Sequence, residues 1–122
     1  MAKILVIDDE VQLREMLKAV LEHAGYDVVL AADGNQGIKL FAEQSFDLIV
    51  TDLIMPDKEG LEIITEIHKA RPETKIIAMS GGGRVGPSGY LKYAEKLGAQ
   101  VSLTKPFENH EFLACVEKLL SS

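Results

Sequence analysis

The chain has 122 residues, 47% of them hydrophobic and 26% charged, and a net charge of −6. This length fits one domain, spanning residues 1–122, that buries a core without disulfides. The acidic balance argues against a nucleic-acid interface built on a basic patch. No apolar run approaches a membrane span or a signal-peptide core, and the single Cys115 cannot form an internal disulfide, so we expect a cytoplasmic protein without a membrane partner.

Five short apolar runs alternate along the chain with amphipathic segments. Most of the runs are unbroken rather than alternating, which predicts strands covered on both faces. These predicted strands are residues 4–7, 28–31, 48–50, 76–79 and 101–103. Between them, apolar residues recur at helical spacing, as in Leu13, Leu17 and Leu21 before a stop at Gly25. Further helices are predicted around residues 38–41, 61–67, 91–97 and 112–120.

Strand and helix alternate five times, which predicts an α/β fold with a mostly parallel sheet and helices on both faces. One stretch interrupts this order. Residues 80–89 read SGGGRVGPSG, and five glycines and a proline in ten residues predict a loop, and a mobile one.

Polar residues collect where the predicted strands end. Asp8 and Asp9 follow the first strand, Asp52 the third, Ser80 the fourth and Lys105 the fifth. Ligands of open α/β sheets bind beyond these carboxyl ends. Two carboxylates ~4 Å apart repel by roughly 4 kcal/mol at an effective dielectric of about 20. A hard divalent cation offsets this repulsion, and oxygen ligands favour Mg²⁺, which also recruits phosphate oxygens. The pattern therefore indicates a phosphoryl site.

Each of these residues alone has an ordinary explanation. Asp8 or Asp9 could cap the next helix, Asp52 could shape a turn, Ser80 could be a loop serine, and Lys105 could be a solvated surface residue. Their joint placement at successive strand ends favours the site.

In these residues the chain resembles the receiver domain of two-component response regulators, and the resemblance extends over essentially its whole length. The resemblance implies a flavodoxin-like, doubly wound (βα)5 fold with a five-stranded parallel sheet in the order 2-1-3-4-5. It rests on motifs that are specific only in combination: Asp8-Asp9, Asp52 with Met55-Pro56 and Gly60, Ser80, and Lys105-Pro106-Phe107.

The resemblance also implies a role for each site residue. Asp52 would be the phosphoacceptor. Asp9, Asp52 and the backbone carbonyl of Ile54 would bind Mg²⁺ (or Mn²⁺), and Asp8 would hold a metal-bound water. Lys105 and the hydroxyl of Ser80 would bind the phosphoryl oxygens, and the bond before Pro106 is expected to be cis.

The implied partner is a histidine kinase or a histidine phosphotransfer protein, and the chain would not be a conventional enzyme. The surface of the fourth helix, fifth strand and fifth helix would report the phosphorylation state to an effector protein, or to an output domain outside this chain. Homodimerisation through the fourth-helix and fifth-helix face stays open.

The sequence departs from the family pattern in three places. Ser102 stands where many receivers carry a switching aromatic, so that role would pass to Tyr90 or Tyr93, unless these residues only pack. The segment from 80 to 98 is longer than usual, and its loop is expected to order in part on phosphorylation. An apolar Ile54 cannot position an attacking water, so we expect slow self-dephosphorylation.

Two other functions fit parts of the pattern. The first is a phosphatase with an aspartyl nucleophile and Mg²⁺. Such enzymes usually space their two acids two apart, whereas Asp8 and Asp9 are adjacent, and the chain has no room for a cap domain. The second is a receiver that binds partners without being phosphorylated. Such domains normally lack one of the five site groups, and here all five are present.

Overall fold

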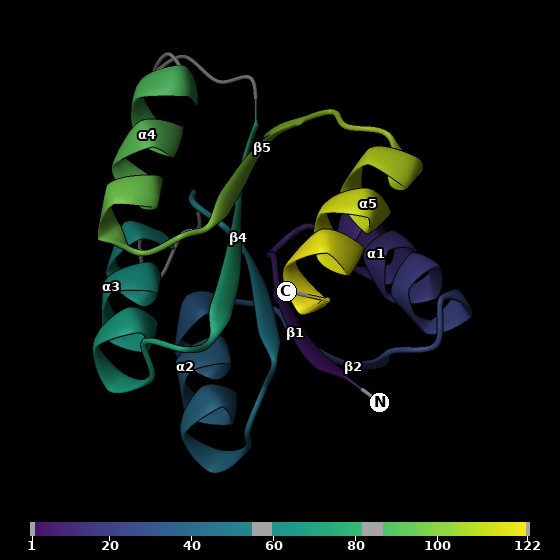
Figure 1. Ribbon diagram of the computed structural model, residues 1–122, viewed down its shortest axis with the longest axis horizontal. Coiled ribbons are helices and arrows are strands. Elements are labelled where there is room, and N and C mark those ends of the chain that lie inside the picture. The colour runs from purple at the N-terminus through teal and green to yellow at the C-terminus, as the bar shows by residue number, and fades with distance from the viewer. Residues whose placement is uncertain (1, 55–59, 82–86, 122) are drawn as a thin grey trace.

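The computed structural model describes residues 2–54, 60–81 and 87–121. Five strands alternate with five helices along the described chain (Figure 1). They are β1 (Lys3–Ile7), α1 (Val11–His23), β2 (Asp27–Ala31), α2 (Gly34–Glu43), β3 (Leu48–Asp52), α3 (Gly60–Ala70), β4 (Lys75–Gly81), α4 (Pro87–Leu97), β5 (Val101–Lys105) and α5 (Asn109–Leu120).

The strands form one parallel sheet in the order β2-β1-β3-β4-β5. Helices α2, α3 and α4 cover one face, and α1 and α5 cover the other (Figure 1). Each face has its own apolar core, because successive side chains of a strand point to opposite faces. Leu5 and Ile49 contribute to the core under α2 and α3, while Val6 and Val50 contribute to the core under α1 and α5. The predicted α/β fold and strand order are confirmed.

The helix boundaries follow local signals in the sequence. The carboxylate of Asp33 accepts a hydrogen bond from the backbone N–H of Gln36 at 2.8 Å and caps the start of α2. Helix α1 is followed by Gly25, whose φ is +98°, and α4 by Gly98, whose φ is +136°. A side chain is strained at such angles, and a Cβ on Gly98 would also lie 2.7 Å from the Cγ of His68.

The predicted loop over residues 80–89 is wrong at both of its ends. Ser80 and Gly81 continue β4, and α4 already begins at Pro87. Proline is favoured at the first position of a helix, where its missing N–H has no helical partner to lose. Residues 82–86 lie outside the described residues, as does the prediction of a mobile loop that rests on them. Among the described helices, none is both long and apolar enough to cross a membrane.

Candidate functional site

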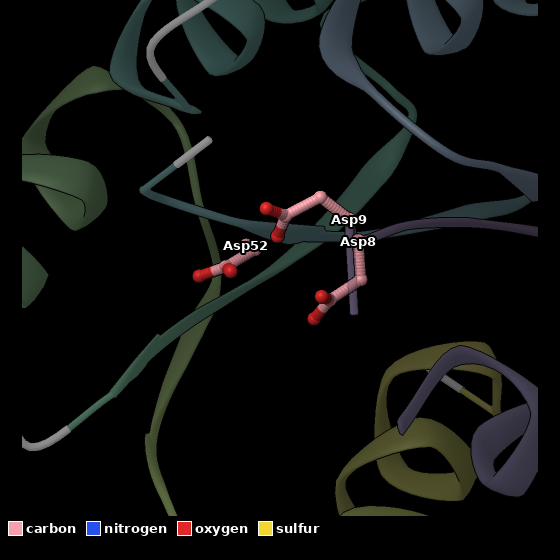
Figure 2. Close-up of side chains that lie close together, drawn as sticks. All are labelled: Asp8, Asp9 and Asp52. Carbon is pink, nitrogen blue, oxygen red and sulfur yellow. The ribbon is translucent and has the colours of Figure 1, made fainter. Parts of the chain in front are cut away.

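Three carboxylates lie together at the carboxyl edge of the sheet. Asp8 and Asp9 follow β1, and Asp52 is the last residue of β3 (Figure 2). Each offers an oxygen, and these oxygens all lie within 4.8 Å of one another. Asp8 and Asp52 are buried, whereas Asp9 is exposed. The parallel register produces this arrangement, because Asp52 pairs with Met79 of β4 and Ile7 pairs with Thr51 of β3.

Lys105, the last residue of β5, reaches into this acidic cluster. Its Nζ lies 3.0 Å from Oδ2 of Asp8 and 3.3 Å from Oδ2 of Asp52, and its side chain is only 18% exposed. The solvated-lysine alternative is therefore wrong. The Lys105–Pro106 bond that follows is cis, as expected.

Burial and charge act against each other in the site. Burial raises the pKa of Asp52 above its ordinary value, Lys105 opposes this, and the neighbouring Asp8 carboxylate adds to the rise. Burial by itself lowers the pKa of Lys105, but the charges of Asp52 and Asp8 outweigh it, so this pKa lies above its ordinary value. One ammonium group thus faces a cluster of three carboxyl groups, and a divalent cation would relieve the remaining repulsion.

The capping alternative for Asp8 and Asp9 is wrong, because the N-cap of α1 is Glu10 and no side chain caps it. The turn alternative for Asp52 holds beside its place in the cluster. Oδ1 of Asp8 accepts a hydrogen bond from the N–H of Glu10 at 2.8 Å, at the start of α1. Oδ1 of Asp52 accepts a weaker one from the N–H of Ile54 at 3.4 Å. In both residues it is Oδ2 that contacts Lys105. The local turn therefore orients each carboxylate toward the cation.

Ser80 lies buried at the same sheet edge, one strand away from Asp52. Its hydroxyl donates to the carbonyl of Gly81 at 3.3 Å. Ile54, with 53% of its surface exposed, stands at the rim of the cluster. Met55 and Pro56 of the motif lie outside the described residues.

Three contacts near the site were not anticipated from the sequence. Nη1 of Arg14 donates to the backbone carbonyl of Asp8 at 2.8 Å. The hydroxyl of Ser102 donates to Oε2 of Glu95 at 2.7 Å and so joins β5 to α4. Gly60 packs so closely that a Cβ would overlap the backbone of Asp52 and Leu53. Of these, only Gly60 had a signal in the sequence, as part of the receiver motif.

The donor set fits a hard divalent cation. The cluster offers carboxylate oxygens alone, and such ligands favour Mg²⁺ or Mn²⁺ over zinc or copper. Two of the three acids are preoriented by hydrogen bonds, which reduces the reorganisation that metal binding requires.

Comparison with known proteins gives a consistent result. The family model described as the response regulator receiver domain matches residues 4–117. The chemotaxis protein CheY of Listeria monocytogenes is 32% identical over 119 residues, which are 97% of this chain and 98% of that protein. The transcriptional regulator NtrC of Azospirillum brasilense is 37% identical over 121 residues, or 99% of this chain. The chain spans only 24% of that regulator's length.

Solved structures agree with this match. The response regulator TrrA of Thermotoga maritima, solved in complex with Mg²⁺-BeF, has a TM-score of 0.87 and 35% sequence identity. The alignment covers 98% of this chain and 100% of that one. A receiver domain protein of Clostridium thermocellum has a TM-score of 0.91 and 32% identity, with 99% and 95% of the two chains covered.

Proposed function

The chain belongs to the response regulator receiver domain family, and from this premise we propose that it is a phosphorylation-dependent switch whose phosphoacceptor is Asp52. A receiver domain is a signalling module and not a conventional enzyme. The observation that carries the proposal is the contact of Lys105 with Asp8 and Asp52 inside the three-carboxylate cluster. A structural ion pair needs one acid, whereas phosphoryl transfer needs a nucleophile, a metal site and a cation together.

The proposed chemistry is transfer from a phosphorylated histidine of a kinase or of a phosphotransfer protein. An oxygen of Asp52 attacks phosphorus, the P–O bond forms as the P–N bond breaks, and the departing imidazole takes a proton from water. Asp9, Asp52 and the carbonyl of Ile54 would hold Mg²⁺, and Asp8 would hold one of its waters. The bound cation would offset charge on the transferring group. Lys105 and Ser80 would bind the phosphoryl oxygens.

The direct test is the intact mass of the protein after incubation with a small-molecule phosphodonor, with and without Mg²⁺. We expect a gain of one phosphoryl group that requires Mg²⁺ and is absent in Asp52→Asn. This variant keeps the size of the side chain and removes the nucleophilic oxygen. No gain in the unsubstituted protein would favour the alternative of a receiver that binds partners unphosphorylated. A gain that persists in Asp52→Asn would place the phosphoacceptor elsewhere.

The acyl phosphate should be long-lived. Ile54 lies two residues after Asp52, its side chain is exposed at the rim of the site, and an apolar group there cannot orient an attacking water. We expect a half-life of minutes or longer for the phosphorylated protein, and faster loss in Ile54→Asn, whose amide can hydrogen-bond water. Decay of the added mass over time measures both. A half-life of seconds in the unsubstituted protein would contradict the prediction.

The proposed readout surface is formed by α4, β5 and α5. Ser80 pairs with Thr104 in the β4–β5 register, and Ala78 pairs with Ser102, so these four side chains share one face of the sheet. The hydrogen bond from Ser102 to Glu95 connects these side chains to helix α4. Tyr93 of α4 is 59% exposed, while the side chain of Tyr90 lies outside the described residues. At the position where many receivers carry a switching aromatic, this chain therefore has Ser102 and its hydrogen bond to α4.

Phosphorylation should accordingly shift amide resonances of Glu95, Ser102 and residues of α5, beyond those next to Asp52. The physical reason is that new bonds from Ser80 and Lys105 to the phosphoryl group favour a different arrangement of the ends of β4 and β5. Two-dimensional ¹H–¹⁵N spectra of the free and phosphorylated protein measure this. Shifts confined to the pocket would contradict the proposed surface.

The wider role is also a proposal. We place the protein in the cytoplasm as one receiver unit over residues 1–122. Its target is either a separate effector or an output domain, and the relatives include both arrangements. The chain spans 98% of the CheY relative but 24% of the NtrC relative. We propose no nucleic-acid or membrane contact for this unit, and homodimerisation through the α4–α5 face stays open.

A further inference from the structure

Arg14 lies in the first turn of α1 and reaches back over the start of the helix. Its Nη1 donates a hydrogen bond to the carbonyl of Asp8 at 2.8 Å. This carbonyl belongs to the peptide between Asp8 and Asp9. Because a peptide unit is planar and rigid, the direction of its carbonyl also sets where the Cα of the next residue lies. Arg14 therefore acts on the backbone that carries Asp9.

The two acids after β1 are held in different ways. The N–H of Asp8 donates to the carbonyl of Ala31 at 3.2 Å, and its carboxylate accepts from Glu10 and Lys105. The carboxylate of Asp9 is exposed and has no hydrogen-bond partner within the described part of the chain. The place of Asp9 in the cluster thus depends on its backbone, and Arg14 bonds that backbone directly.

Electrostatics alone does not explain an arginine at this position. A cation in the first turn of a helix opposes the helix dipole, whose positive end is there. It also repels a divalent cation bound nearby. Attraction to the three carboxyl groups offsets both effects, but a cation at any nearby position would supply it, whereas the bond to the carbonyl of Asp8 needs the guanidinium of Arg14 at this position.

We propose that Arg14 is a positioning residue of the metal site, which fixes the Asp8–Asp9 peptide so that the carboxylate of Asp9 faces Asp52. This inference rests on the proposed function, because it assumes that the cluster binds Mg²⁺. The ion demands near-ideal octahedral geometry, so a small displacement of one ligand weakens binding. Groups that orient metal ligands typically contribute 10- to 100-fold in affinity.

Calorimetric titration with Mg²⁺ alone tests the proposal. We expect Arg14→Gln to weaken Mg²⁺ binding by about tenfold, and Arg14→Lys, which still donates a hydrogen bond, to recover part of the loss. Lys18→Gln is the matched control, because it removes the same charge one turn further along α1 and should leave the affinity unchanged. In the metal-free protein, the amide resonances of Asp9 and Glu10 should shift in Arg14→Gln while the Tm stays the same.

The opposing outcomes are distinct. Arg14→Gln removes a positive charge, so charge repulsion alone predicts tighter Mg²⁺ binding, and an unchanged or higher affinity overturns the proposal. A lower Tm with resonance shifts spread over β1 and α1 assigns Arg14 to general stability and overturns it too. If the unsubstituted protein binds no Mg²⁺, the metal part of the proposed function fails. The amide shifts of the metal-free variant then still decide whether Arg14 fixes the Asp9 backbone.

Discussion

Replacing Lys105 with methionine should lower the free energy of unfolding of the metal-free protein by about 3 kcal/mol at neutral pH, the usual range for breaking a buried ion pair from one side. Methionine keeps the length of the side chain and removes the charge. The side chains of Asp8 and Asp52 are 0% and 9% exposed, and within the described part of the chain Lys105 is the cation that contacts both. Urea unfolding in the presence of a chelator measures the effect.

The pH dependence of the Lys105→Met variant supplies a check on the cause. Burial already raises the pKa of Asp52, and Lys105 holds it down. Without Lys105 the pKa of Asp52 should rise further. A carboxyl whose pKa is raised by folding favours the folded state below that pKa and loses this contribution as the pH rises through it. The loss in free energy of unfolding caused by Lys105→Met should therefore be largest at neutral pH and become smaller as the pH falls.

Two further samples complete this experiment. Adding Asp52→Asn to Lys105→Met should recover much of the lost stability, because it removes one of the two unpaired charges. Mg²⁺ should also stabilise the Lys105→Met variant, since the metal takes over the neutralising role. Equal penalties at acidic and neutral pH, with no rescue by either route, would show that Lys105 contributes packing rather than charge.

The sequence predicted the strands well because their burial is two-sided. In β1 and β3 the apolar residues are continuous, and the structure buries them fully between two helical layers. The predicted strands end too early, because their last residues are polar. Strand β3 continues to Asp52 and β5 to Lys105, and polar residues in the last strand positions carry no hydrophobic signal although the backbone still pairs.

The acidic cluster was predictable because parallel strands present their carboxyl ends at one edge. Asp8, Asp52 and Lys105 meet there as expected. The contact of Arg14 with the carbonyl of Asp8 was not predictable, since helical periodicity places a residue on a face but does not identify the carbonyl that its side chain reaches. The bond between Ser102 and Glu95 is of the same kind. It depends on the distance between α4 and β5, which only the packed structure contains.

Gly60→Ala should destabilise the protein by about 3 kcal/mol, the upper range for overpacking, and should abolish Mg²⁺-dependent phosphorylation. A Cβ at Gly60 would overlap the carbonyl oxygen of Asp52 and the Cα of Leu53. These are backbone atoms, so no rotamer change relieves the overlap. Either α3 moves away from β3, or the peptide after Asp52 shifts. The N–H of Gly60 donates to the carbonyl of Leu53 at 2.9 Å, which ties the two segments together, so both should be disturbed.

Gly81→Ala is the matched control for this last prediction. Gly81 adjoins the same sheet edge, but a Cβ there would meet no atom within 4 Å, and its φ is not positive. The free energy of unfolding of Gly81→Ala should therefore stay near that of the unsubstituted protein. Urea unfolding and intact mass after phosphodonor treatment compare the two variants. Equal stability of Gly60→Ala and Gly81→Ala would mean that α3 can retreat from Asp52 freely. The close approach of α3 would then have no part in shaping the phosphoacceptor site.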